Sequence, residues 1–299
     1  MKQIVFNNKK LSKLSLGTVQ FGLDYGISNT KGQPNQEEVN DIIKYVCENG
    51  INCFDTAQAY GNSEAVLGKA INNQNDIFII SKLKSEIFIN EATSNVSKSL
   101  NHLSINCLYG LLLHDSELLY NWKNEYTLLV NNLIKENKIK YFGVSIYTNE
   151  DFELAVDNPS IKFIQIPFNI FDQRAISENW LEKAKQNNKL IFIRSVFLQG
   201  LFFMDVNKLP DNLCNAKKYL IKFNEYCYKL NISKSQLALN FVDTVAQDSI
   251  LLFGCDNIEQ AKENIESYNN LELLNTSIIE DIIKDFNNID ENIYNPTKW

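Results

Sequence analysis

Three titratable side chains directly follow apolar runs in the first half of the sequence. They are Asp55, Lys82 and His114, and a fourth, Tyr60, lies in the glycine-bearing loop after Asp55. Apolar runs of this kind are typical of buried strands, and in a barrel of parallel strands the active site lies where the strands end. A carboxylate, an ammonium, a phenol and an imidazole that meet there can transfer a proton to a bound polar group. The sequence therefore predicts an acid–base site.

Each of the four side chains has an ordinary explanation when it is taken alone. Asp55 at the end of a strand can cap a helix, Lys82 can be solvated, and His114 can be a hydrogen-bonded core histidine. Tyr60 beside a glycine is most often an aromatic packed against its own loop. Their occurrence after consecutive predicted strands favours one shared site over four unrelated roles.

Apolar runs alternate with amphipathic segments along the chain, as expected for repeated strand–helix units. The predicted strands are Leu14–Thr18, Ile51–Phe54, Ile77–Ile80, Cys107–Leu113, Tyr141–Val144, Phe163–Ile166, Leu190–Ile193 and Ile250–Phe253. The predicted helices are Glu37–Asn49, Ser63–Ile71, Glu91–Leu103, Leu118–Asn137, Asp151–Val156, Ser177–Asn187, Cys214–Leu230, Ser233–Ala246, Asn257–Tyr268 and Ile278–Asn287.

This alternation predicts a single (β/α)8 TIM barrel domain over residues 1–299, with a short N-terminal hairpin at residues 3–14. A doubly wound parallel sheet is the alternative fold. The glycines of the first loop, Gly22 and Gly26, do not form G-x-G-x-x-G, the dinucleotide fingerprint of a Rossmann domain.

Composition excludes several other classes of function. The net charge of −7 argues against a nucleic-acid partner, which requires clustered Lys and Arg. None of the six cysteines forms a C-x-x-C pair and the chain has two histidines, so we expect no metal site. The free thiols and the lack of a signal-peptide core predict a cytoplasmic protein. No apolar run approaches the roughly 18 residues of a membrane span.

Several motifs together resemble the aldo-keto reductases. F-D-T-A-Q-A-Y-G-N-S-E contains Asp55 and Tyr60, I-I-S-K ends at Lys82, and L-L-L-H-D contains His114. L-G-T-V-Q-F-G at Leu16–Gly22 and G-V-S, which ends at Ser145, also match the family. The resemblance runs from about residue 14 to residue 268. R-S-V-F-L-Q-G-L at residues 194–201 is similar to a bacterial subgroup associated with sugar or surface-polysaccharide genes.

The resemblance implies a reductase that uses NAD(P)H on an aldehyde or ketone, with a sugar derivative as one possible substrate. Tyr60 would be the proton donor, and the ammonium of Lys82 would lower the pKa of that phenol. Asp55 would pair with Lys82, and His114 would donate a hydrogen bond to the carbonyl oxygen. No metal is needed for this chemistry.

The resemblance also implies a set of cofactor contacts. Gln165 and Ser145 match residues that bind the nicotinamide carboxamide, and Arg194 stands where many members place an aromatic ring. Asp256 stands where many members have an arginine for the 2′-phosphate, so NADPH is expected but NADH is a real alternative. The expected cofactor residues are Gly17, Thr18, Ser145, Gln165, Arg194, Ser195, Gly254, Asp256, Gln260 and Asn264.

Tyr25 and Trp122 are the predicted substrate contacts, and further apolar candidates for the mouth of the site are Phe21, Leu118, Leu201, Phe202 and Phe203. Two other functions stay open at this point. A cofactor-binding regulatory subunit of the same fold would show no turnover, and a lyase or aldolase would use Lys82 as a Schiff base. Neither the substrate nor the oligomeric state follows from the sequence.

Overall fold

The computed structural model describes residues 1–27, 29, 31–72, 74, 76–271 and 274–299. Eight parallel strands form a closed barrel in the order β10-β3-β4-β5-β6-β7-β8-β9, which confirms the predicted (β/α)8 fold. These strands are β3 (Leu14–Gly17), β4 (Cys53–Asp55), β5 (Phe78–Leu83), β6 (Leu108–Leu113), β7 (Ile139–Ser145), β8 (Phe163–Pro167), β9 (Leu190–Arg194) and β10 (Ile250–Phe253).

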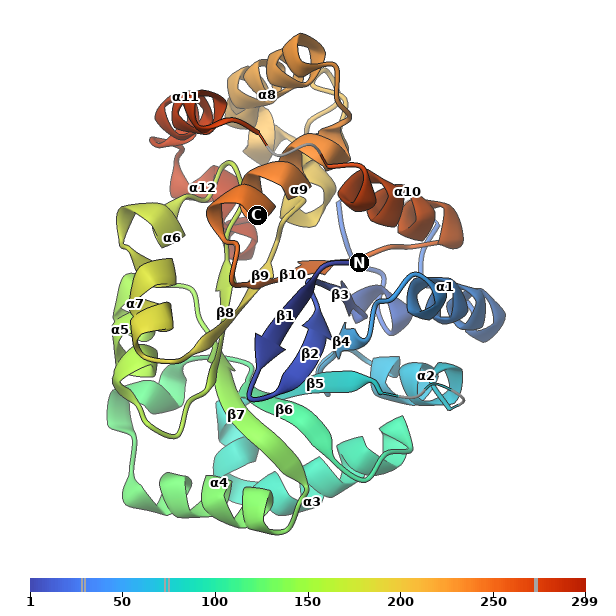
Figure 1. Ribbon diagram of the computed structural model, residues 1–299, viewed down its shortest axis with the longest axis vertical. Helices are drawn as coiled ribbons and strands as arrows, with labels where there is room; N and C mark the ends of the chain where they lie inside the picture. The colour runs from blue at the N-terminus through green and yellow to red at the C-terminus, as the bar shows by residue number, and fades with distance from the viewer. Residues whose placement is uncertain (28, 30, 73, 75, 272–273) are drawn as a thin grey trace.

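Helices surround the barrel and cover its outer face (Figure 1). They are α1 (Gln36–Glu48), α2 (Ser63–Ala70), α3 (Ser85–Leu103), α4 (Asn124–Lys135), α5 (Asn149–Asp157), α6 (Arg174–Ser177), α7 (Trp180–Gln186), α8 (Lys217–Leu230), α9 (Lys234–Val245), α10 (Ile258–Asn269), α11 (Thr276–Phe286) and α12 (Glu291–Tyr294). Short 3-10 segments are η1 (Val19–Phe21), η2 (Glu117–Asn121), η3 (Leu198–Phe203), η4 (Asp211–Ala216) and η5 (Pro296–Lys298).

Three predicted helices differ from the observed ones. α3 begins at Ser85, six residues before the predicted start, because the Asp115 carboxylate accepts a hydrogen bond from the backbone N–H of Ser85; it is kinked at Glu91. The predicted helix Leu118–Asn137 is wrong in its first part, where Trp122 is extended and separates η2 from α4. The predicted helix Ser177–Asn187 is divided into α6 and α7 by Asn179 in the left-handed conformation.

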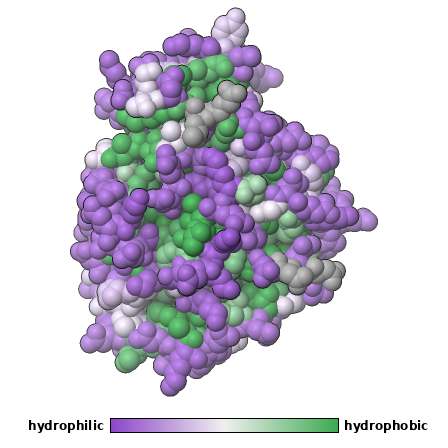
Figure 2. Space-filling view, viewed as in Figure 1, coloured by the Kyte–Doolittle hydropathy of each residue, from purple (hydrophilic) through white to green (hydrophobic). Residues whose placement is uncertain are grey.

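The hairpin of β1 (Gln3–Phe6) and β2 (Lys9–Ser12) lies across the end of the barrel at which the strands begin (Figure 1). Its side chains Phe6 and Leu11 pack against the apolar layer inside the barrel, and the Phe6 ring contacts Tyr141 and Phe163. This closes one end of the barrel and leaves the other for a site. The face of the molecule on which the hairpin lies is mainly hydrophilic, with apolar patches in between (Figure 2). Within the described residues, no helix combines the length and apolar character needed to cross a membrane.

Candidate active site

The candidate site is one polar layer inside the barrel, two residues beyond an apolar layer. Side chains two apart on a strand point to the same face, so the residues that follow the apolar layer by two also point inward. The apolar layer includes Cys53, Ile80, Leu112, Phe163 and Phe192, among others. The corresponding polar residues are Asp55, Lys82, His114, Gln165 and Arg194, and Ser145 takes the same place on β7 after Gly143. Strand periodicity therefore brings together residues that are up to 139 positions apart in the sequence.

A buried ion pair lies at the centre of this layer. The Lys82 ammonium donates to Asp55 Oδ1 at 2.5 Å and to the Thr56 carbonyl oxygen at 3.0 Å. Lys82 and Asp55 are only 1% and 3% exposed. Gln165 Nε2 donates to the other carboxylate oxygen, Asp55 Oδ2, at 2.8 Å. Both carboxylate oxygens are thus satisfied, and the lysine has one further donor directed at Tyr60, 3.4 Å from the phenol oxygen.

Two glycines in direct contact determine where the Tyr60 loop lies. A Cβ on Gly22 would lie 1.8 Å from the Tyr60 carbonyl oxygen. A Cβ on Gly61 would lie 2.3 Å from the Gly22 carbonyl oxygen, and Gly61 has a φ of +57°, which favours glycine. On the other side, Ser63 Oγ donates to the Thr18 carbonyl oxygen at 2.7 Å and fixes the start of α2 to the loop after β3. The Tyr60 side chain is therefore held by backbone packing.

We expect Gly22→Ala to destabilise the protein by about 1–3 kcal/mol, because a Cβ here overlaps backbone that cannot rotate away. Urea unfolding measures the loss. Gly17→Ala is the matched control, since its Cβ would make an ordinary 3.5 Å contact with the Phe253 carbonyl oxygen and should change the unfolding free energy little. Equal stability of the two variants would show that the loop after β3 adjusts and does not fix Tyr60.

Burial and charge act in opposite directions on the two titrating groups next to the cavity. Burial raises the pKa of Tyr60, and the nearby Lys82 charge offsets only part of that rise. Burial by itself would lower the pKa of Lys82, but Asp55 and then Tyr60 together raise it above its usual value. Lys82 is thus a stable cation and Tyr60 a protonated phenol. The sequence predicted the lowering influence of Lys82 correctly but not that burial exceeds it.

His114 is the neutral member of the group. Burial, and then the Lys82 charge, lower its pKa to about 3, so the imidazole carries no charge at neutral pH. Its ring lies edge-on to the Tyr60 ring, with centroids 5.5 Å apart. Among the described residues, the buried Nδ1 atom has no hydrogen-bond partner. A neutral imidazole beside a phenol offers one N–H to a polar group in the cavity.

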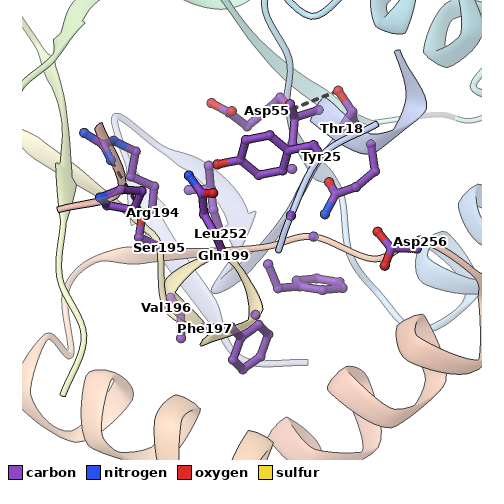
Figure 3. Close-up of a pocket in the computed structure, with 18 of the residues that line it drawn as sticks. Thr18, Tyr25, Asp55, Arg194, Ser195, Val196, Phe197, Gln199, Leu252 and Asp256 are labelled. Atoms are coloured by element: carbon purple, nitrogen blue, oxygen red, sulfur yellow. Dashed lines mark hydrogen bonds between the residues drawn. The ribbon is translucent and has the colours of Figure 1, made fainter. Parts of the chain in front are cut away.

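A cavity of about 710 Å³ opens on this layer and extends to the start of α10 (Figure 3). Asp55, Tyr60 and His114 line it, whereas Lys82 lies behind Tyr60. Tyr25, a predicted substrate contact, lines it as well. All ten residues predicted to contact a cofactor are on its wall, namely Gly17, Thr18, Ser145, Gln165, Arg194, Ser195, Gly254, Asp256, Gln260 and Asn264.

Several residues predicted to line the mouth of the site do not lie there. Trp122 is not a wall residue, because its ring packs between Tyr126 and Phe142 and its Nε1 donates to Thr127 Oγ1 at 2.9 Å. Four further candidates are also absent from the cavity wall and are instead buried in the core: Phe21, Leu118, Leu201 and Phe202. The side chain that does line the cavity in this region is Phe203.

Sequence reasoning missed several polar residues of the wall, among them Tyr147 and Gln199. Gln199 follows Leu198 and precedes Gly200, and all three have positive φ angles of 49–93°, as does Ser195 at 62°. This irregular loop places Gln199 on the same cavity wall as Tyr25. Burial raises the pKa of Tyr25 to about 12, so this phenol also keeps its proton. No periodic pattern in the sequence signals such a loop.

The end of the cavity near α10 is acidic. The Asp256 carboxylate accepts from Gln260 Nε2 at 3.2 Å, and the Asp256 backbone N–H donates to Gln260 Oε1 at 2.8 Å. Glu263 also lines this end. Lys262, the nearest cation in sequence, lies over the Tyr45 ring on α1 and is not part of the wall. Figure 3 shows Asp256 and Arg194 on opposite sides of the cavity.

Comparisons with known proteins identify the family and agree with the fold. The model of the aldo/keto reductase family matches residues 13–284. An uncharacterized oxidoreductase, YqkF of Bacillus subtilis, is 24% identical over 290 residues, which cover 87% of this chain and 88% of that protein.

Two solved structures have the same fold. Aldo-keto reductase AKR11C1 from Bacillus halodurans superposes with a TM-score of 0.78 at 19% identity, over the full length of both chains. An aldo/keto reductase from Klebsiella pneumoniae, solved in complex with NADP and acetate, has a TM-score of 0.72 at 20% identity over 96% of each chain.

Proposed function

The chain belongs to the aldo/keto reductase family, and on that premise we propose that it reduces an aldehyde or ketone to an alcohol with Tyr60 as the proton donor. The observation that carries the proposal is the Lys82 ammonium, which lies between the Asp55 carboxylate and the Tyr60 phenol at the wall of the cavity. A sugar derivative is a suitable substrate, because the wall near Tyr60 offers the polar side chains of Tyr25, Gln199 and His114.

The cavity fits a nicotinamide dinucleotide. The cavity has a volume of about 710 Å³ and extends from Tyr60 to the start of α10. A helix N-terminus favours phosphate groups. Two buried polar atoms on the wall lack partners within the described part of the chain, His114 Nδ1 and Gln20 Oε1. Ser145 and Gln165 would hold the carboxamide end, and Asp256, Gln260 and Asn264 the adenosine end. When bound, the reduced cofactor supplies the hydride.

The protein's own residues donate the proton and stabilise the developing negative charge. Tyr60 donates its proton to the carbonyl oxygen as negative charge builds there. Lys82 remains charged beside the phenol oxygen and stabilises the phenolate that is left. Asp55, held by Gln165, fixes the position of that ammonium. Neutral His114 donates a hydrogen bond to the same carbonyl oxygen and orients it.

Absorbance at the nicotinamide band tests the proposal directly. Purified protein is mixed with NADPH or NADH and with aldehydes, ketoses and sugar derivatives, and consumption of the reduced cofactor is expected. Cofactor binding without turnover on any carbonyl would instead support a regulatory subunit. Borohydride trapping of a substrate on Lys82 would support a lyase, but the short contact with Asp55 does not favour a free amine there.

Cofactor choice depends on Asp256. A carboxylate repels a 2′-phosphate, and no Lys or Arg among the described residues lines the cavity at the α10 end. We therefore propose that NADH serves at least as well as NADPH. Asp256→Arg should shift the NADPH-to-NADH ratio of kcat/KM by about tenfold or more toward NADPH, because charged hydrogen bonds are worth roughly 1.5–3 kcal/mol.

Dissociation constants from nicotinamide fluorescence should shift in the same sense in Asp256→Arg. Asp256→Asn is the matched control, since it removes the negative charge without adding a cation and should give a smaller shift. If neither variant changes the ratio, Asp256 does not face the 2′ position of the bound cofactor.

A further inference from the structure

The end of the cavity that Tyr60 lines also carries a cation, Arg194, that forms no ion pair within the described residues. Arg194 ends β9 and lines the cavity, and within the described residues no carboxylate forms an ion pair with it. The one carboxylate of this layer, Asp55, already accepts from Lys82 and Gln165. A half-buried guanidinium without a counter-charge is costly, so its presence here requires a function.

The surroundings of Arg194 fix the plane of its guanidinium but leave donors free. The group stacks on the Tyr147 ring, 4.0 Å from the ring centroid, and Nη2 donates to the Ile146 carbonyl oxygen at 3.1 Å. The contact between Nη1 and Ser195 Oγ is long, at 3.5 Å. A guanidinium has five N–H donors, and these two contacts use only two of them. A fixed planar fork of this kind suits the two oxygens of a carboxylate or phosphate.

The position of Arg194 indicates that the anion belongs to the substrate. Its charge acts on Tyr25, Tyr60 and His114, so it lies near the atoms that would react. It lies across the cavity from Asp256, where the adenosine end of the cofactor is proposed to bind (Figure 3). An anion on Arg194 would therefore be close to the carbonyl group that Tyr60 protonates.

Charge balance favours the same conclusion. When bound, the oxidised cofactor would carry a positive charge in the same cavity that Arg194 lines. With a neutral substrate, two like charges then share a half-buried cavity, and their repulsion opposes the reaction. With an anionic substrate, the negative group of the substrate compensates the charge of Arg194 both before and after hydride transfer. That negative group takes no part in the reaction.

We propose that Arg194 binds a carboxylate or phosphate group of the carbonyl substrate, so that the preferred substrates are acidic aldehydes or ketones. This inference depends on the proposed reductase function. The reduced cofactor would supply the hydride, which carries both electrons, and Tyr60 would supply the proton. The product is the corresponding hydroxy acid or phosphorylated alcohol.

Matched substrate pairs test the inference. Succinic semialdehyde is compared with butanal, glucuronate with glucose, and glyceraldehyde 3-phosphate with glyceraldehyde. The wild-type protein should favour at least one anionic member by about tenfold or more in kcat/KM. Arg194→Gln should lose about 10–100-fold more on that substrate than on its neutral partner, the effect expected for a charged hydrogen-bonded pair. Comparison of the carboxylate pairs with the phosphate pair identifies the anion.

Controls separate this role from simpler ones. Arg194→Lys keeps the charge without the fork and should lie between wild type and Arg194→Gln. Lys44→Gln removes one exposed positive charge from α1 and should leave the preference unchanged. The dissociation constant of the reduced cofactor is measured by fluorescence without substrate in wild type and in Arg194→Gln, so that an effect on cofactor binding is separated from the effect on the substrate. Succinate should inhibit reduction of butanal competitively in wild type and lose that inhibition in Arg194→Gln.

Four results would overturn the inference. Equal losses on charged and neutral substrates would place Arg194 on the carbonyl oxygen, and a tenfold weaker cofactor complex would place it on the cofactor's phosphates. Reduction of neutral aldehydes without preference for the acidic ones would remove this inference and leave the proposed function intact. Absence of turnover on every carbonyl, with the cofactor bound, would remove both.

Discussion

We expect Tyr60→Phe to remove most of the reductase turnover and to leave the fold and cofactor binding intact. Proton donation by a positioned side chain typically contributes about 10²–10⁴-fold, and phenylalanine keeps the ring that packs edge-on against His114. Turnover is measured under single-turnover conditions, where chemistry limits the rate. The loss should appear in kcat rather than in the dissociation constant of the cofactor.

Tyr25→Phe is the matched control for Tyr60→Phe. Tyr25 is a second phenol on the same wall, and burial also keeps it protonated. Within the described part of the chain no lysine lies against its phenol, so its loss should cost no more than about tenfold. If Tyr60→Phe retains nearly all of the wild-type rate, or if Tyr25→Phe is the more damaged variant, the proton donor has been assigned to the wrong residue.

Lys82→Met should reduce turnover as strongly as the tyrosine change and should also alter its pH dependence. Burial raises the pKa of Tyr60 and the Lys82 charge opposes that rise, so removing the charge raises this pKa further. In the oxidation direction Tyr60 must first lose its proton, and the rate increases as pH rises through its pKa. The ascending limb of the kcat/KM profile for alcohol oxidation should therefore move to higher pH in Lys82→Met.

Stability must be measured beside activity in this variant, because Lys82→Met leaves the buried Asp55 carboxylate without its cation. Breaking a buried ion pair in this way typically costs about 3–5 kcal/mol. The double variant Asp55→Asn with Lys82→Met removes both charges and should recover stability but not turnover.

Asp55→Asn alone should be less damaging to turnover than Lys82→Met, since Asp55 acts on the proton donor through the lysine. An unchanged pH profile in Lys82→Met would detach the lysine from the proton transfer.

The number and order of the strands could be predicted from the sequence because buried parallel strands are continuous apolar runs. All eight predicted barrel strands are present, with bounds that shift by a few residues. Helix boundaries were less predictable. The kink at Glu91 and the breaks at Trp122 and Asn179 depend on single backbone conformations that side-chain periodicity does not encode.

The sequence by itself determined which residue types end the strands, and the two-residue period of a strand determined that Asp55, Lys82 and Arg194 point inward. Only the tertiary structure decided which of these side chains touch. Gln165 reaches Asp55 across 110 positions of sequence because the barrel closes, and closure depends on the packing of all eight strands. Loop geometry likewise placed Gln199 in the cavity and Trp122 outside it, because loop conformations depend on contacts with distant segments rather than on a local pattern.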